Sequence, residues 1–190
     1  MISKPVFDDP KPFFFRSFPS PFPSWGIFFV LLPQTIFQIM SRIIRIVVHC
    51  TGEPSTARRN KEYYRRWFFD VLNWKHYGYH AVVYQDGTWE RLQPLPEPVN
   101  GVGVITDATK ANGQPGTNEN SIHVAYVGGL EPVSKLPKDT RTEAQKKTLW
   151  SLVAMWKKEY NITEVIGHRD WPGVHKACPC FDAKTTYRNA

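Results

Sequence analysis

With 190 residues and a mass of 22.0 kDa, the chain has room for one domain with a proper hydrophobic core and hardly enough for two. Its net charge of +7 favours polyanionic partners, but the basic residues are scattered and form no run that would select nucleic acid, anionic lipid or cell wall. Three cysteines, an odd and small number, exclude the disulfide framework of a stapled secreted domain, so a metal-binding or reactive role for them is worth testing.

The first 40 residues differ in composition from the rest of the chain. They contain nine of the twelve phenylalanines and seven of the sixteen prolines. The apolar run over 25–32 is too short for a membrane-spanning helix, which needs about 20 residues. No small-residue cleavage pattern follows that run, so secretion is the minor alternative. We expect residues 1–40 to be a disordered or wrongly annotated extension and residues 41–190 to be the functional domain.

The first half of the domain shows three patterns. Residues 43–49 are β-branched and apolar almost throughout, which predicts a buried central strand ending at His49. Apolar and aromatic residues at spacings of three and four predict an amphipathic helix over 58–74. Residues 79–84 and 88–92 flank an Asp-Gly turn, which predicts a β-hairpin.

The second half begins with a segment over 94–120 that is rich in Gly, Pro and Asn, and we expect a long surface loop there. Residues 121–127 are a further strand candidate. The clearest helix signal covers 142–160, where Thr142 and Gln145 have the spacing of a capping box.

Two short elements close the chain. A strand is predicted over 164–167 and a short helix over 182–188. Strands and helices therefore alternate, with one hairpin among them. This order predicts an α/β fold: a single domain with a central mixed β-sheet and helices packed on its faces.

Two histidines stand where α/β sheets tend to place their sites. His49 and His168 both follow predicted strands at their carboxyl ends, and Cys178 comes ten residues after His168. Two imidazoles and one thiolate are three protein ligands, which leave the fourth tetrahedral position of a zinc ion open for water. Such a zinc lowers the pKa of its bound water to about 7 and so supplies the nucleophile of an amide hydrolase.

A closed structural zinc site is the alternative, with Cys180 or Cys50 as fourth ligand. Neighbouring side chains on a strand point to opposite faces, which argues against Cys50 next to His49. The Cys-x-Cys spacing of Cys178 and Cys180 is tighter than the usual gap between zinc ligands. The open site is therefore favoured.

Two more residues are candidates for catalysis. In an extended stretch, Lys176 would leave the chain on the same face as Cys178, where a cation can stabilise an oxyanion. An ordinary solvated lysine is the alternative. Tyr79 begins the hairpin, and its hydroxyl can orient a nucleophile or donate a hydrogen bond to the scissile carbonyl. The alternative is that Tyr79 is an aromatic side chain that only packs.

Together the motifs resemble a known family from about residue 42 to the end of the chain. They are VVHCT at 47–51, GYHAVVYQDGT at 78–88, NSIHVAYVGG at 120–129, GHRD at 167–170 and KACPCFD at 176–182. The combination is similar to the type-2 N-acetylmuramoyl-L-alanine amidases, whose fold is shared by bacteriophage lysozyme-like amidases and peptidoglycan recognition proteins.

The resemblance implies one Zn²⁺ per chain, held by His49, His168 and Cys178, with Tyr79 and Lys176 as the catalytic pair. The implied reaction is hydrolysis of the amide between N-acetylmuramic acid and L-alanine in peptidoglycan. Whether Tyr79 is the base or only orients the metal-bound water stays open. The absence of wall-binding repeats favours a phage or prophage endolysin that is cytoplasmic until released to the wall, acting as a monomer without stable membrane association.

This sequence also departs from the family. The segment over 99–119 lacks the histidine that contacts substrate in many relatives, and His123 replaces a usual glycine. We expect His123 to be a local packing variation, because its strand is otherwise apolar, and Cys50 and Cys180 to be buried small residues.

Three other functions compete with the amidase. A non-catalytic peptidoglycan-binding recognition module is the strongest, but such proteins typically lack the cysteine ligand that Cys178 supplies here. Nucleic-acid binding is not expected, because no basic stripe interleaved with aromatics is present. A zinc hydrolase with another amide substrate stays open.

Overall fold

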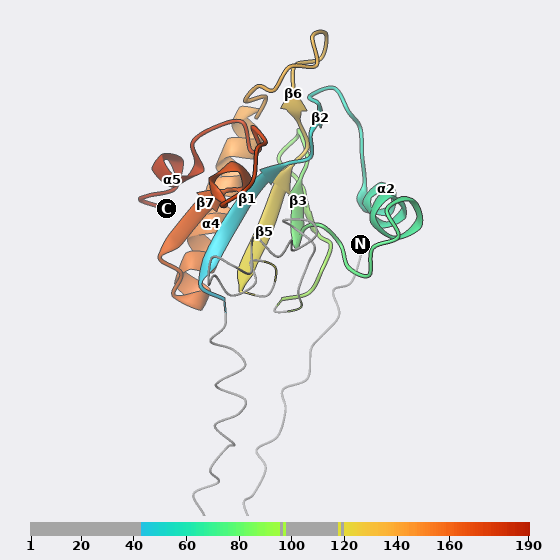
Figure 1. Cartoon of the computed structure of the whole chain (residues 1–190). Helices are drawn as coiled ribbons and strands as arrows, with labels where there is room; N and C mark the ends of the chain where they lie inside the picture. The colour runs from blue at the N-terminus through green and yellow to red at the C-terminus, as the bar shows by residue number, and fades with distance from the viewer. Residues whose placement is uncertain (1–42, 96, 98–117, 119) are drawn as a thin grey trace, which may run out of the picture. The chain divides into compact units, whose positions relative to one another are not determined.

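The computed structural model describes residues 43–95, 97, 118 and 120–190. The predicted extension over 1–40 and most of the predicted loop over 94–120 lie outside these residues. The prediction of an α/β fold is confirmed, because a central mixed sheet has helices packed against it (Figure 1).

Five strands form the main sheet in the order β4-β3-β5-β1-β7. They are β1 (Arg45–Cys50), β3 (Ala81–Val83), β4 (Trp89–Arg91), β5 (Ser121–Tyr126) and β7 (Glu164–Gly167). The predicted hairpin is present as the antiparallel pair β3 and β4, whereas β3, β5, β1 and β7 run parallel. The carboxyl ends of β1, β5 and β7 therefore lie at one edge of the sheet.

A second, two-stranded sheet extends beyond that edge. It pairs β2 (Glu53–Pro54) with β6 (Gly129–Leu130) in parallel. The backbone N–H of Thr51 donates to the carbonyl of Tyr126 at 3.0 Å, so pairing between the two chain segments continues past the ends of β1 and β5. Two-residue strands are too short for any periodicity, which is why the sequence did not predict them.

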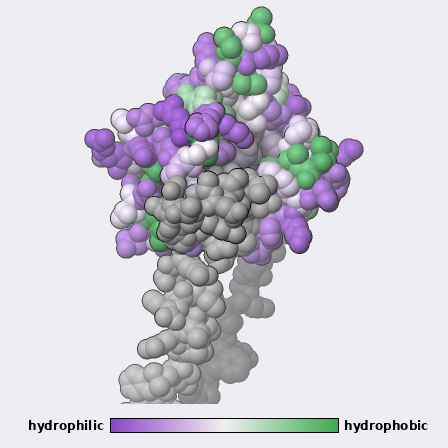
Figure 2. Space-filling model, in the orientation of Figure 1, coloured by the Kyte–Doolittle hydropathy of each residue, from purple (hydrophilic) through white to green (hydrophobic). Residues whose placement is uncertain are grey.

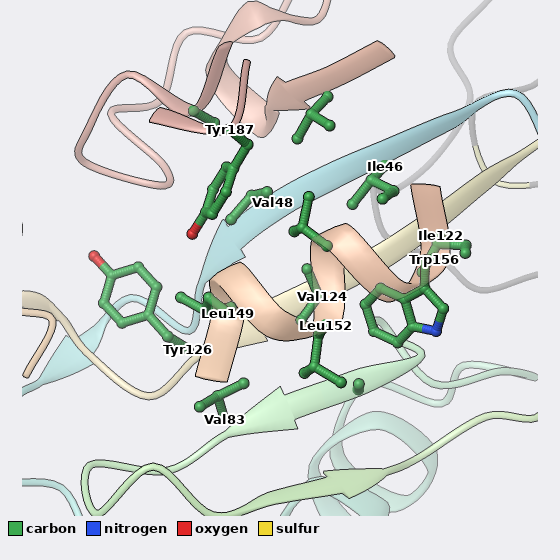
Figure 3. Close-up of a cluster of buried hydrophobic side chains, with 14 of the residues drawn as sticks. Ile46, Val48, Val83, Ile122, Val124, Tyr126, Leu149, Leu152, Trp156 and Tyr187 are labelled. Carbon is green, nitrogen blue, oxygen red and sulfur yellow. The ribbon is translucent and has the colours of Figure 1, made fainter. Parts of the chain in front are cut away.

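Helix α4 (Glu143–Tyr160) covers one face of the sheet, and its predicted capping box is present. The side chain of Thr142 accepts from the backbone N–H of Gln145 at 3.1 Å, and the Gln145 side chain accepts from Thr142 at 3.0 Å. Figure 3 shows the buried face of the helix against the sheet. This core joins apolar residues of the helix to those of two central strands: Leu149, Leu152, Trp156, Ile46, Val48, Ile122 and Val124.

Gln145 also joins the helix to the sheet, and we predict a large effect of removing it. Its fully buried Nε2 donates to the carbonyls of Val83 and Val127 at 3.2 and 3.0 Å. Gln145→Leu removes the donor from both carbonyls, and within the described part of the chain only the Val83 carbonyl keeps another bond, from the N–H of Val127 at 2.9 Å. The lost bonds should lower the free energy of unfolding by about 2–4 kcal/mol. Urea denaturation measures this, with the exposed Lys146→Ala as control, for which we expect a change within about 0.5 kcal/mol. Equal stabilities of the two variants would contradict the prediction.

The helix predicted over 58–74 is shorter in the structure and is divided into two types of helix. The structure has α2 (Lys61–Arg65), followed by a π-helix, η1 (Arg66–Val71). The helix begins late because the Asn60 side chain caps it, accepting from the N–H of Tyr63 at 2.9 Å. It ends before residue 74 because Asn73 is left-handed, with φ of 52°.

This helical segment covers the second face of the sheet. Its side chains Tyr64 and Phe68 pack with Val82 and Val127 in a separate apolar cluster. The two faces of the sheet are thus covered by different helices, and His49 projects on the face opposite to α4, like Val47 two residues before it.

The chain after β7 returns across the edge where β1 and β5 end. It begins with the 3₁₀ turn η2 (His168–Asp170). The short helix predicted over 182–188 is present as α5 (Ala183–Thr186), and the Asp182 side chain caps it. The Tyr126 hydroxyl donates to the carbonyl of Pro179 at 2.8 Å, and this bond holds the returning segment at the end of β5.

The described surface is mostly hydrophilic in the view of Figure 2. Among the described residues, large exposed hydrophobic side chains include Val133 and Leu136 after β6, and Trp67 and Val71 in η1. None of the helices in the described ranges is both long and apolar enough to cross a membrane.

Candidate metal centre

Three predicted ligands meet at the edge of the sheet where β1 and β7 end. His49 is the penultimate residue of β1, His168 follows β7 directly, and Cys178 lies on the returning segment. Their nearest ligand atoms all lie within 4.8 Å of one another. Both histidines are buried and the cysteine is half-buried. The parallel strands β1 and β7 bring the two histidines together because their carboxyl ends lie side by side, and the returning segment adds Cys178.

Two of the three separations match those around a tetrahedral zinc ion, and the third is at most 4.8 Å. His49 Nδ1 lies 3.2 Å from His168 Nδ1 and 3.8 Å from Cys178 Sγ. Zinc bonds of about 2.0–2.1 Å to nitrogen and 2.3 Å to sulfur give tetrahedral edges of about 3.3 Å between nitrogens and about 3.6 Å between nitrogen and sulfur. Two imidazole nitrogens and a thiolate are also the donor types that zinc prefers. The residues present therefore fit a zinc ion.

Burial keeps both histidines neutral at physiological pH. It lowers the pKa of His168 to about 4, with a smaller contribution from the positive charge of Lys176. Burial also lowers the pKa of His49 well below its usual value, and the neighbouring His168 and His123 act in the same direction. A neutral imidazole has a lone pair available, so neither histidine must lose a proton to bind a metal near pH 7.

The main chain holds Cys178 beside the histidines. The backbone N–H of Cys50 donates to Cys178 Sγ at 3.2 Å, and the N–H of Arg169 donates to the Cys178 carbonyl at 2.7 Å. These two bonds fix the position of Cys178 Sγ next to His49 Nδ1, 3.8 Å away.

The other two cysteines lie on the far side of β1. Cys50 is buried in the core under α4, as expected, and its Sγ is 3.8 Å from Cys180 Sγ. Cys180 is only half-buried, and its thiol donates to the Gly129 carbonyl at 3.3 Å. Burial and the neighbouring Cys50 raise the pKa of Cys180 to about 12. Within the described residues, the group of potential metal ligands contains neither of them.

Tyr79 and Lys176 both lie near this centre. The Tyr79 ring centroid is 5.3 Å from that of His49. Burial, followed by the charge of Cys178, raises the pKa of Tyr79, so its hydroxyl keeps its proton at neutral pH. Lys176 is exposed, and its positive charge helps to lower the pKa of both His49 and His168.

The environment of His123 differs from the sequence-based expectation. His123 is fully buried, and its Nδ1 lies 3.0 Å from Nε2 of His49. The expectation of packing alone is therefore wrong. The sequence contained no signal for this contact, because it depends on the register of β1 against β5, in which Val47 pairs with His123.

His80 supports His123 from the other side, and it gives the protein a pH-dependent stability. Its Nδ1 accepts from the backbone N–H of His123 at 2.9 Å, and its Nε2 donates to the carbonyl of Glu97 at 2.8 Å. Burial lowers the pKa of His80 from 6.5 to about 4, with Arg91 acting in the same direction.

We predict that the stability contributed by neutral, buried His80 is present above about pH 6.5 and is lost as the pH falls toward 4. The unfolded chain binds the proton first, so acid favours unfolding. Between pH 7 and pH 4.5, the loss attributable to His80 should be about 2–3 kcal/mol. Urea unfolding of metal-free protein at both pH values measures it. His80→Asn should lose correspondingly less stability, and an equal loss in both proteins would contradict the assignment.

The sequence is similar to proteins of one family. Residues 40–181 match the family described as N-acetylmuramoyl-L-alanine amidase. The endolysin of Klebsiella phage KP32 is 31% identical over 140 residues, which cover 74% of this chain and 82% of that protein.

Solved structures share the fold. The Ph2119 endolysin from a Thermus scotoductus MAT2119 bacteriophage matches with a TM-score of 0.55 and 23% identity, over 76% of this chain and 84% of that one. The bumblebee protein PGRP-SA matches with a TM-score of 0.51 and 15% identity, over 78% and 81%. At these identities the likeness concerns the fold alone.

Proposed function

Since this chain belongs to the N-acetylmuramoyl-L-alanine amidase family, we propose that it is a zinc-dependent hydrolase of bacterial peptidoglycan. The bond cleaved is the amide between the lactyl group of N-acetylmuramic acid and L-alanine. Water is added across this C–N bond, so the products are a lactyl carboxylate on the glycan strand and a stem peptide with a free L-alanine amine.

The observation that carries the proposal is the cluster of His49, His168 and Cys178. Three donors of the right type lie within 4.8 Å of one another, and both imidazoles are kept neutral by burial. Three protein ligands leave one tetrahedral position for water or substrate, as in catalytic zinc sites. When bound, zinc would supply Lewis acidity and lower the pKa of water toward 7.

Two side chains of the chain itself would assist this reaction. Lys176 is exposed beside the cluster, so its ammonium can stabilise the negative charge that develops on the carbonyl oxygen of the substrate. The raised pKa of Tyr79 favours a role as hydrogen-bond donor, orienting the attacking water or the carbonyl, over a role as general base.

The biological setting that fits best is lysis by a bacteriophage. The relative from Klebsiella phage KP32 is named an endolysin. We propose that this protein is an endolysin too, that it acts as a monomer, and that it stays in the cytoplasm until the membrane is opened and then reaches peptidoglycan. Its positive net charge of +7 suits an anionic wall surface.

A peptidoglycan-binding module without catalysis is the second candidate, because the fold is shared with PGRP-SA. The complete set of metal donors argues for hydrolysis, since binding alone does not require three converging ligands with an open fourth position.

The test is to incubate purified peptidoglycan with zinc-loaded and with chelator-treated protein, and to analyse the soluble products by mass spectrometry. Zinc-dependent release of peptides that begin with L-alanine, with intact glycan strands, is expected. Binding to peptidoglycan without release would favour the recognition module, and release of sugar fragments or of peptides cut elsewhere would overturn the proposed bond specificity.

A further inference from the structure

A row of buried imidazoles lies on the sheet face that carries the candidate metal centre. His49 on β1 is 1% exposed and His123 on β5 is fully buried. Their ring nitrogens, His49 Nε2 and His123 Nδ1, are 3.0 Å apart. This distance is a hydrogen bond, so one of the two nitrogens carries the proton and the other accepts it.

The position of the other ring nitrogen of His49 decides which one donates. His49 Nδ1 faces His168 Nδ1 at 3.2 Å and Cys178 Sγ at 3.8 Å, so Nδ1 is the atom placed to bind a metal. A neutral imidazole that offers its Nδ1 lone pair must carry its proton on Nε2. That Nε2–H is buried and needs an acceptor, and His123 Nδ1 is in the acceptor position.

We propose that His123 is a positioning residue for the metal centre: its Nδ1 accepts the hydrogen bond from His49 Nε2–H and so holds His49 in the tautomer and ring orientation that present Nδ1 to the metal. This inference rests on the proposed zinc site. Metal-binding histidines usually donate their second N–H to a carboxylate, a backbone carbonyl or water. In this chain a second imidazole takes that place.

The surroundings of His123 make it a rigid acceptor. Its backbone N–H donates to His80 Nδ1 at 2.9 Å, and its carbonyl accepts from the His80 N–H at 2.8 Å. The His123 ring is also enclosed by rings on both sides. Its centroid lies 5.2 Å from that of His49 and 6.0 Å from that of His80.

His80 is in turn held in one tautomer. A backbone N–H can only donate, so His80 Nδ1 must accept and its proton must be on Nε2, which donates to the Glu97 carbonyl at 2.8 Å. His80 therefore fixes the backbone of His123, and the His123 side chain fixes His49.

The opposite tautomer, with the proton on His123 Nδ1, would have a different consequence for metal binding. If His123 Nδ1 carried the proton and donated to His49 Nε2, then neutral His49 would be protonated at Nδ1 and that atom would be unable to bind a metal. Only an acceptor at position 123 supports the metal centre. A substitution that keeps an acceptor should therefore differ from one that keeps only the size of the ring.

The experiment measures zinc affinity by competition with a chelating dye, for the wild type, His123→Phe and His123→Asn. His123→Phe keeps a ring without an acceptor and should weaken zinc binding about 10- to 100-fold, the usual effect of losing an outer-shell partner. His123→Asn offers an amide oxygen and should recover most of this loss. If His123→Phe does not fold, His123→Leu serves as the variant without an acceptor.

Val124→Ala is the matched control, because Val124 is an equally buried neighbour on β5 that faces α4 rather than the metal centre. It should lose thermal stability and keep its zinc affinity. The absorption bands of cobalt-substituted protein are a second readout. These bands should shift in His123→Phe, because the loss of the acceptor changes how His49 is held. They should stay unchanged in Val124→Ala.

Two results would overturn the inference and leave the proposed function intact: wild-type zinc affinity in a folded His123→Phe, or a folded His123→Asn that binds zinc as weakly as His123→Phe. Wild-type protein that binds no zinc would instead overturn the proposed metal centre, and this inference with it. The wild-type measurement therefore separates the two failures.

Discussion

Replacing Cys178 by alanine is expected to abolish zinc binding and amidase activity together. The thiolate is the one anionic donor of the cluster, and without it two neutral imidazoles remain to hold the ion. The loss of zinc affinity should exceed the 10- to 100-fold effect typical of outer-shell partners. Zinc content after dialysis and release of stem peptides from peptidoglycan, measured on the same preparations, test this expectation.

Cys180→Ser provides the control for Cys178→Ala. Cys180 is only two residues away, but its Sγ contacts Cys50 and the Gly129 carbonyl and is not among the converging ligand atoms. The Cys180→Ser variant should therefore retain one zinc per chain and its amidase activity. A Cys178→Ala protein that is fully active and metal-loaded would exclude Cys178 as a ligand, and loss of zinc from Cys180→Ser alone would exchange the roles of the two cysteines.

Lys176→Ala is expected to separate turnover from metal binding. Lys176 is exposed and contributes no ligand, so the variant should fold and bind zinc like the wild type. If its ammonium stabilises the developing oxyanion, kcat should fall by about 10²- to 10³-fold, the usual effect of removing one such group. Steady-state kinetics on a soluble muropeptide, together with zinc content, measure both quantities.

Two further lysine variants make this test specific. Lys176→Arg keeps the positive charge and should retain more activity than Lys176→Ala, though not all of it, because the guanidinium differs in shape and hydration. Lys184→Ala removes an exposed lysine on α5 and should leave kcat unchanged. An unaltered kcat in Lys176→Ala would remove Lys176 from the mechanism.

The order of the elements and the place of the cluster follow from local patterns in the sequence. The β-branched run before His49 and the apolar run before His168 predict strands that end at these residues, and the structure has β1 and β7 there. The capping box of Thr142 and Gln145 likewise predicts where α4 begins, and the structure has the helix start there. Periodicity, caps and turn residues act over a few neighbours along the chain, so one sequence is enough to recognise them.

Other features depend on contacts between distant segments. The change from α2 to the π-helix η1 accompanies the packing of Tyr64 and Phe68 against the sheet, and no local pattern indicated it. The hydrogen bond between His49 and His123 likewise joins residues 74 positions apart. Local propensity therefore specifies which strands form and where they end. The side chains that face each other across those strands are decided by register and packing, which exist only in the folded sheet.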